Sequence, residues 1–336
     1  MVDQQHPGER PGPAGDDTRF GGLGEAGVLA RILPLLPSGP TSLLGPGDDA
    51  AVVAAPDGRV VVSTDVLVEG HDFRHDWSGG ADVGWKAAAQ NLADVAAMGA
   101  TPTALVVGLA APPDLPVAWA EDLARGLAQA CAGTGAVVVG GDLSGAEQVM
   151  VAVTVLGDLG GRAPLTRSGA HPGDVLAVAG TLGQSAAGLA LLESGEVSLA
   201  PELVDVHRRP RPPLAAGPAA ARAGATALID VSDGLLLDAG RVAAASGVHV
   251  DLDPAALAGH VSPLLAAAGG DGDRALRWVL TGGEDHALAG CFPPDAALPA
   301  GFTPLGRVLE AGEGPAVLVG GAPPPVDGGG WDHFAR

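Results

Sequence analysis

The chain has 336 residues, of which 47% are hydrophobic and 17% charged, and its formal net charge at pH 7 is -21. This length suits two domains of ordinary size, and the apolar content is typical of a well-buried globular protein rather than a disordered one. The negative charge argues against nucleic acid and against an anionic membrane surface, because phosphate groups attract lysine and arginine. An acidic protein can still bind phosphorylated small molecules when divalent cations bridge its carboxylates to the phosphates.

The two cysteines, Cys131 and Cys291, lie far apart in the sequence and form no CxxC pair. The sequence therefore indicates neither a disulfide framework nor a zinc site. The N-terminal segment has no apolar signal core, and no uncharged apolar run is long enough to span a bilayer. We expect a cytoplasmic protein. Lys86 is the only lysine, which a compositional bias of the genome explains most simply.

The first half of the chain is expected to comprise a disordered tail, residues 1–20, and an N-terminal domain, residues 21–160. The predicted elements of this domain are, in chain order, helix 24–36, strand 51–53, strand 59–63, helix 81–98, strand 103–109, helix 117–132, strand 136–139 and strand 149–157. The loop-like stretch 160–173 separates it from the second half.

The second half, residues 161–336, is expected to form a C-terminal domain. Its predicted elements are strand 175–179, helix 183–192, helix 214–223, a strand ending at 228–229, helix 234–245, strand 248–252, helix 275–280 and strand 287–292. Because strands alternate with helices, the pattern predicts an α/β architecture.

The stretch from Ala227 to Gly234 combines a short apolar strand with two carboxylates. Asp230 and Asp233 flank the hydroxyl of Ser232 directly after the apolar run. Such an oxygen-rich corner is costly in apolar surroundings unless a cation neutralises it. The sequence therefore predicts a cation site at this corner.

Further aspartates stand at the edges of other apolar segments, with hydroxyl side chains among them. They are Asp48, Asp49, Asp65, Asp94 and Asp142, and the hydroxyls belong to Ser63 and Thr64. A single Asp is more often a turn former or a helix cap than a ligand, but the recurrence favours metal binding. Oxygen ligands suit Mg²⁺, whereas the thiolate and imidazole groups preferred by zinc or copper are nearly absent from these segments.

The predicted helix 81–98 has one polar stripe on an otherwise apolar cylinder. Lys86, Gln90 and Asp94 are spaced by four residues, with Asn91 beside them. Side chains at this spacing share one helix face. A solvated face and a functional stripe are equally compatible with the spacing.

The sequence lacks the usual motifs of nucleotide-binding sites and of catalytic nucleophiles. The chain has no GxxxxGK[ST], no protein-kinase motif set, no GxSxG and no GxGxxG between a predicted strand and a predicted helix. Phosphoryl transfer nevertheless suits the acidic inventory, because its loose transition state needs positioning and charge neutralisation more than a covalent nucleophile. Arg167 offers a cationic fork for a nucleotide phosphate, and a loop salt bridge is an equally good interpretation of it.

Seven segments together resemble the thiamine-monophosphate kinase family, which lies within the aminoimidazole ribonucleotide synthetase-like superfamily. They are GPGDDA at 45–50, STDVLVEG at 63–70, KAAAQNLADVAAMGA at 86–100, GGD at 140–142, LTRSGA at 165–170, DVSDG at 230–234 and TGGED at 281–285. The resemblance extends from about Gly24 to Trp331. It implies a two-domain α/β fold of the α+β type, in which an N-terminal sheet domain pairs in a homodimer and an α/β domain follows.

The resemblance also implies ATP-dependent phosphorylation of thiamine monophosphate to thiamine diphosphate, by direct transfer assisted by several Mg²⁺ ions. The metal ligands it implies are Asp49, Ser63, Thr64, Asp65, Asp94, Asp142, Asp230 and Asp233, of which Asp65, Asp94 and Asp233 are the catalytic residues. The ATP contacts it implies are Gly141, Asp142, Arg167 and Ser232.

At the thiamine end, the resemblance implies contacts with Asp72, Glu284 and Trp331, because a cationic thiazolium favours a carboxylate and an aromatic ring. Members of the family often have His directly before the residue that corresponds to Phe73. Here Asp72 occupies that place and His71 precedes it. Asp72 is the positional match.

Two alternatives remain beside the kinase. One is another ATP-using enzyme of the same superfamily, and the other is a catalytically silent homologue that binds nucleotide or metal. Selenophosphate synthesis would require a reactive Cys or selenocysteine near the N-terminus, and the segment before Gly45 has neither.

Overall fold

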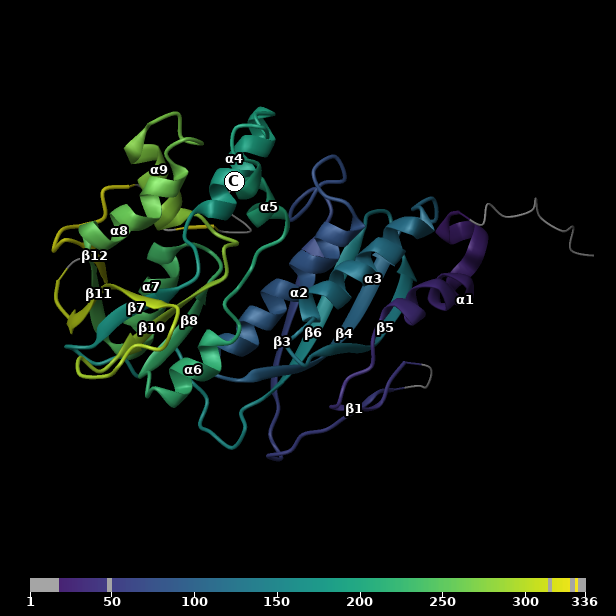
Figure 1. Cartoon of the computed structure of the whole chain (residues 1–336), viewed down its shortest axis with the longest axis horizontal. Coiled ribbons are helices and arrows are strands. Elements are labelled where there is room, and N and C mark those ends of the chain that lie inside the picture. The colour runs from purple at the N-terminus through teal and green to yellow at the C-terminus, as the bar shows by residue number, and fades with distance from the viewer. Residues whose placement is uncertain (1–17, 47–49, 314–315, 327–329, 332–336) are drawn as a thin grey trace, which may run out of the picture.

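The computed structural model describes residues 18–46, 50–313, 316–326 and 330–331. Its main sheets are a four-stranded sheet in the order β3-β6-β4-β5 and a six-stranded sheet in the order β12-β9-β11-β7-β10-β8. The two sheets lie in different halves of the molecule, and helix α2 lies between them (Figure 1). Among the described residues, no helix is both long enough and apolar enough to cross a membrane.

The first half supplies the four-stranded sheet, a small hairpin and the helices that cover one sheet face. Its elements are α1 (Phe20–Ile32), η1 (Leu33–Leu35), β1 (Ser42–Leu44), β2 (Val52–Val53), β3 (Val61–Val68), α2 (Gly80–Ala97), β4 (Thr101–Ala111), α3 (Val117–Cys131), β5 (Val137–Gly145) and β6 (Met150–Asp158). β6 pairs antiparallel with both β3 and β4, while β4 and β5 are parallel.

The second half supplies the six-stranded sheet and the remaining helices. Its elements are β7 (Val175–Ala179), α4 (Gln184–Ser194), α5 (Pro201–Arg208), α6 (Ala216–Arg222), β8 (Ala227–Val231), α7 (Leu235–Ser246), β9 (Val248–Leu252), α8 (Pro254–Val261), η2 (Ser262–Leu264), α9 (Gly272–Thr281), β10 (Ala287–Phe292), β11 (Phe302–Glu310) and β12 (Val317–Val319). Only the β9 and β12 pair is parallel in this sheet.

Helix α2 connects the two halves through close backbone packing. A β-carbon on Gly84 would collide with the carbonyl oxygen of Leu123 in α3, so this glycine permits the two helices to approach. At the other end of α2, Ala96 and Ala97 belong to a buried cluster with residues of the second sheet, including Leu228. α2 therefore holds its polar stripe at the boundary between the sheets.

The predicted mixed fold with two domains of the α+β type is confirmed, and several element boundaries are corrected. β3 continues to Val68, so Thr64 and Asp65 lie inside a strand rather than after it. β5 likewise continues to Gly145 and contains Asp142. Polar residues and glycines in these strands resemble loop sequence, but ladder hydrogen bonds to neighbouring strands extend both elements.

Some elements were not predicted from the sequence. Helices α5 and α8 are short, and each begins at a proline, a residue that more often indicates a loop. Strands β11 and β12 follow stretches rich in proline and glycine. The first helix begins at Phe20, four residues before the predicted start, and Gly24 has a non-helical φ of 65° inside it.

Candidate active site

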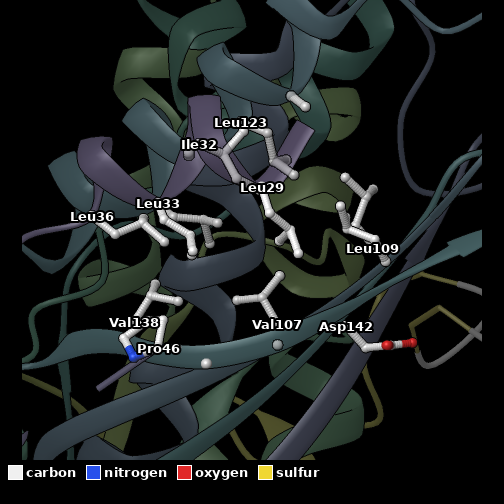
Figure 2. A pocket seen from close by; sticks show the side chains of 16 residues that line it. Leu29, Ile32, Leu33, Leu36, Pro46, Val107, Leu109, Leu123, Val138 and Asp142 are labelled. Carbon is white, nitrogen blue, oxygen red and sulfur yellow. The ribbon is translucent and has the colours of Figure 1, made fainter. Parts of the chain in front are cut away.

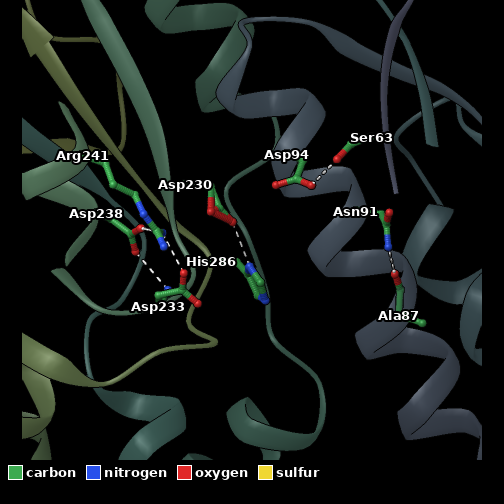
Figure 3. Close-up of polar contacts among 9 residues, drawn as sticks. All are labelled: Ser63, Ala87, Asn91, Asp94, Asp230, Asp233, Asp238, Arg241 and His286. Carbon is green, nitrogen blue, oxygen red and sulfur yellow. Dashed lines mark hydrogen bonds and ion pairs between the residues drawn. The ribbon is translucent and has the colours of Figure 1, made fainter. Parts of the chain in front are cut away.

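A cleft of about 1000 Å³ lies between the two halves of the molecule. Its walls come from β3 and the turn after it, from α2 and α4, and from the turns that follow β8 and α9. Many of the residues predicted to form the site line this cleft, namely Thr64, Asp65, Asp72, Asp94, Asp230, Ser232, Asp233, Glu284 and Trp331. The carboxylates from the two halves face one another across it (Figure 3).

Asp94, on the wall of the cleft that the first half forms, has a carboxyl group whose pKa is strongly raised. The hydroxyl of Ser63 in β3 donates a hydrogen bond to Asp94 Oδ2 at 2.6 Å, so Ser63 acts at the site although it belongs to a strand. Burial, followed by the negative charge of Asp230, raises the pKa of Asp94 to about 7. The hydrogen bond from Ser63 and the positive charge of His286 lower this pKa but do not offset the burial, and a divalent cation would supply further positive charge.

Asp230 forms the C-terminal counterpart and is buried at the end of β8. Its Oδ2 lies 2.9 Å from His286 Nδ1. Burial alone would lower the pKa of His286, but the hydrogen bond and charge of Asp230 outweigh it and raise this pKa above its ordinary value. His286 was missed in the sequence, where its only signal is its position directly before a predicted strand.

Asp233 is paired with a cation of the protein itself. Arg241 Nη1 lies 2.7 Å from Asp233 Oδ2 and 2.5 Å from Asp238 Oδ1. The fully buried Asp238 also accepts a hydrogen bond from the backbone N–H of Asp233 at 3.0 Å. Burial raises the pKa of Asp238 to about 6. Arg241 and Asp238 were not predicted, although both follow Asp233 on the first turns of α7.

Glu284 lies close to a nitrogen atom from each half of the molecule. Lys86 Nζ lies 2.9 Å from its Oε1, and His207 Nδ1 lies 3.3 Å from its Oε2. Burial would raise the pKa of Glu284, but the positive charge of Lys86, the largest opposing cause, helps to hold this pKa below its ordinary value. Ser185 contacts the same ring nitrogen of His207 at 3.0 Å, so these groups do not have the geometry of a hydrolase triad.

Two of the predicted thiamine contacts are held by the backbone. Asp72 Oδ2 accepts a hydrogen bond from the backbone N–H of Val68 at 2.7 Å, which closes the turn after β3. The backbone N–H of Trp331 donates to the carbonyl of Asp233 at 2.8 Å. His71 also lines the cleft, so the structure brings both members of the His71 and Asp72 pair to it.

The predicted ATP contacts are not all in this cleft. Gly141 and Asp142 line a separate, largely apolar cavity of about 60 Å³ beneath α1 and η1 (Figure 2). Arg167 lies in the loop between the halves, where its backbone carbonyl accepts a hydrogen bond from Ser246. Thr64 directs its hydroxyl to the carbonyl of Val153. Asp49 lies outside the described residues.

The carboxylates of the cleft suit Mg²⁺ better than a metal ion whose ligands all come from the protein. Among the described residues, no three His, Cys, Asp or Glu side chains lie together closely enough to hold one ion. Mg²⁺ usually takes only one or two carboxylates and completes its shell with water and substrate phosphates. Asp94, Asp230 and Asp233 on opposite walls suit that manner of binding, with phosphate oxygens between them.

Comparison with known proteins identifies the family of the chain. Residues 47–159 match the family model for the N-terminal domain of AIR synthase related proteins, and residues 171–276 match the family model for the C-terminal domain. The chain is 51% identical to the thiamine-monophosphate kinase of Mycobacterium tuberculosis over 93% of this chain and 90% of that protein. The chain belongs to the thiamine-monophosphate kinase family.

More distant members of the thiamine-monophosphate kinase family are less identical to this chain but match the same share of it. The Escherichia coli enzyme is 37% identical over 93% of this chain and 98% of its own length. A solved structure described as AaThiL complexed with AMPPCP and TMP has 33% identity and a TM-score of 0.75, and the match covers 93% of this chain and 97% of that one. The similarity to the thiamine-monophosphate kinase family thus includes both walls of the cleft.

Proposed function

We propose that this chain catalyses the ATP-dependent phosphorylation of thiamine monophosphate to thiamine diphosphate. The observation that carries the proposal is the cleft in which Asp94 from α2 faces Asp230 and Asp233 from the second half. Family membership supplies the substrates, since a structure similar to this chain contains AMPPCP and TMP. The acceptor is itself a phosphate, so transfer needs no general base.

The residues of the cleft divide the work between the two ends of the substrate. Asp65, Asp94, Asp230 and Asp233 would hold Mg²⁺ ions, which when bound neutralise the phosphates and align donor with acceptor. Ser63 orients Asp94, while Asp238 and Arg241 orient Asp233. At the other end, we propose that Glu284 and Trp331 receive the thiazolium and its flat ring, with Asp72 beside them.

ATP contacts at Gly141, Asp142, Arg167 and Ser232, and metal contacts at Asp49, Thr64 and Asp142, remain part of the proposal. Asp142 and Ser232 line different cavities, so one nucleotide would have to extend from one cavity to the other. We further propose that the domains divide near residue 160. The use of ATP favours a cytoplasmic location.

We also propose that the chain forms a homodimer through the open face of its four-stranded sheet. Helices α2 and α3 lie against the other face (Figure 1). The register pairs Thr154 with both Thr64 and Val106, which places these three on the same face. Val62, Val66, Val106 and Met150 leave large apolar surfaces exposed there, and such a patch favours a protein partner. A second copy would bury it.

The decisive test mixes purified protein with ATP, MgCl₂ and thiamine monophosphate, and measures thiamine diphosphate and ADP. We expect one ADP for each thiamine diphosphate, and loss of product when EDTA removes the metal. ATP binding without any product would overturn the kinase proposal in favour of a silent homologue. Product formation that survives EDTA would overturn the role of Mg²⁺.

A further inference from the structure

Lys86 joins the two segments that are proposed to contact the thiamine end of the substrate. It lies on α2, and its side chain is only 4% exposed. Its Nζ donates to Glu284 Oε1 at 2.9 Å and to the backbone carbonyl of Asp72 at 3.4 Å. One ammonium group therefore connects the turn after β3 in the first half with the turn after α9 in the second half.

The backbone that carries Glu284 is fixed by other contacts. Glu284 has a φ of 64° and His286 a φ of 53°, values that strain a residue with a side chain. Between them, the buried Asp285 accepts hydrogen bonds from Thr181 Oγ1 at 2.7 Å and from the backbone N–H of Gln184 at 3.1 Å. The freedom that remains at Glu284 is the rotation of its long side chain.

The hydrogen bond from Lys86 and the proximity of His207 restrict that rotation. Lys86 Nζ donates to Glu284 Oε1 at 2.9 Å, and His207 Nδ1 lies 3.3 Å from the other carboxylate oxygen, Oε2. Burial, and then the charge of Lys86, lowers the pKa of His207 to about 4, so this imidazole is neutral at pH 7. Lys86 is thus the charged partner of Glu284, whose side chain is 36% exposed and reaches the cleft.

We propose that Lys86 is a positioning residue that fixes the Glu284 carboxylate and the Asp72 turn for recognition of the cationic ring of the substrate. This inference rests on the proposed function. Lys86 does not line the cleft itself and acts through Glu284. Removal of Lys86 would leave the carboxylate of Glu284 without its charged partner, and the side chain would then turn toward water.

The test compares four proteins, wild type, Lys86→Met, Glu284→Gln and the double variant, by steady-state kinetics and thermal unfolding. We expect Lys86→Met to raise the KM for thiamine monophosphate about tenfold or more, the loss typical of one charge-assisted hydrogen bond, with the KM for ATP nearly unchanged. The double variant should have the KM of Glu284→Gln alone, because both changes break one interaction. Lys86→Arg should recover part of the affinity.

Stability provides the readout that separates positioning from folding. The double variant lacks both charges, so its Tm should return toward that of wild type while its KM for thiamine monophosphate stays high. This variant also tests the inference if Lys86→Met does not fold. A KM that recovers together with the Tm, or additive effects of the two single changes, would overturn the inference.

Failure of the inference and failure of the proposed function give different results. Wild-type turnover together with an unchanged KM for thiamine monophosphate in Lys86→Met would overturn the inference alone. A wild-type protein that neither binds nor phosphorylates thiamine monophosphate, measured by calorimetry and by product formation, would overturn the proposed function and this inference with it.

Discussion

Asp233 is held on two sides by groups of helix α7. Its carboxylate pairs with Arg241, and its backbone N–H donates to Asp238. These contacts do not depend on substrate. An amide has nearly the same shape as a carboxylate, so exchanging one for the other at Asp233 changes the charge and hardly changes the shape. Arg241 keeps Asp238 as a partner after that exchange.

Asp233→Asn should lower kcat about a hundredfold or more and leave the Tm close to that of wild type, since the proposed Mg²⁺ site loses a charged ligand. Kinetics and thermal unfolding check this expectation. Asp295→Asn, a change at an exposed position, serves as the control and should leave both quantities unchanged. Near-normal turnover in Asp233→Asn would show that the metal site lies elsewhere.

Asp285 makes stability depend on pH. Burial, only partly offset by the hydrogen bond from Thr181, raises the pKa of Asp285 to about 6, above the ordinary value of 3.8. Well below pH 3.8 the carboxyl is protonated in both the folded and the unfolded chain. Between about pH 4 and pH 6 the unfolded chain releases its proton first, so the free energy of unfolding falls as pH rises.

Asp285→Asn removes this titration. As pH increases from about 4 to 6, the free energy of unfolding of the variant relative to wild type should therefore rise by about 3 kcal/mol. The difference in Tm should rise with it. Thermal unfolding at half-unit pH steps in EDTA measures the difference. A constant difference from pH 4 to pH 7 would show that Asp285 has an ordinary pKa in the folded protein.

At the level of elements, helix α2 depends on close contact with α6. A β-carbon on Gly217 of α6 would collide with the carbonyl oxygen of Ala96, two residues after Asp94. An added methyl group there would push α2 away from the second sheet. The distance between the carboxylates of the two walls would change with it.

Gly217→Ala should destabilise the fold by about 1–3 kcal/mol, the usual cost of overpacking, and should lower kcat. Gly259→Ala in α8 is the matched control, because nothing lies within 4 Å of the position that a β-carbon would take there. That control should raise stability by about 0.5–1 kcal/mol through helix propensity. Equal Tm values for the two variants would contradict the contact between α2 and α6.

The sequence located the acidic residues of the site better than their partners. β8, the DVSDG corner and α7 were predicted in the observed order, because a buried strand, a turn and a helix carry clear local signals. Lys86 and Glu284 are 198 positions apart, and no local pattern reveals that they meet. The spacing of the polar residues on α2 could not distinguish a solvated face from a functional one. The tertiary structure distinguishes them, because it buries Lys86 and places Asp94 in the cleft.

At the level of the whole molecule, the open sheet face is the surface most suited to a second copy. Val62 is 63% exposed on β3, and Val106 lies on the same face in β4. Two glutamates at these positions would place charge where the proposed interface excludes water. Leu199 is 51% exposed but lies outside the sheet.

We expect wild type to have the mass of a dimer in size-exclusion chromatography with light scattering, and the double variant Val62→Glu, Val106→Glu to have half that mass. Leu199→Glu should remain dimeric. A monomeric wild type at micromolar concentration, or a double variant with an unchanged mass, would contradict the proposed interface.

The solitary Lys86 has a practical consequence for spectroscopy. Because the chain contains one lysine, isotope labelling of that amino acid would give a single ammonium signal for the whole protein. That signal would come from the point where the two turns meet. Its chemical shift would report each step of ligand binding without assignment of any other resonance.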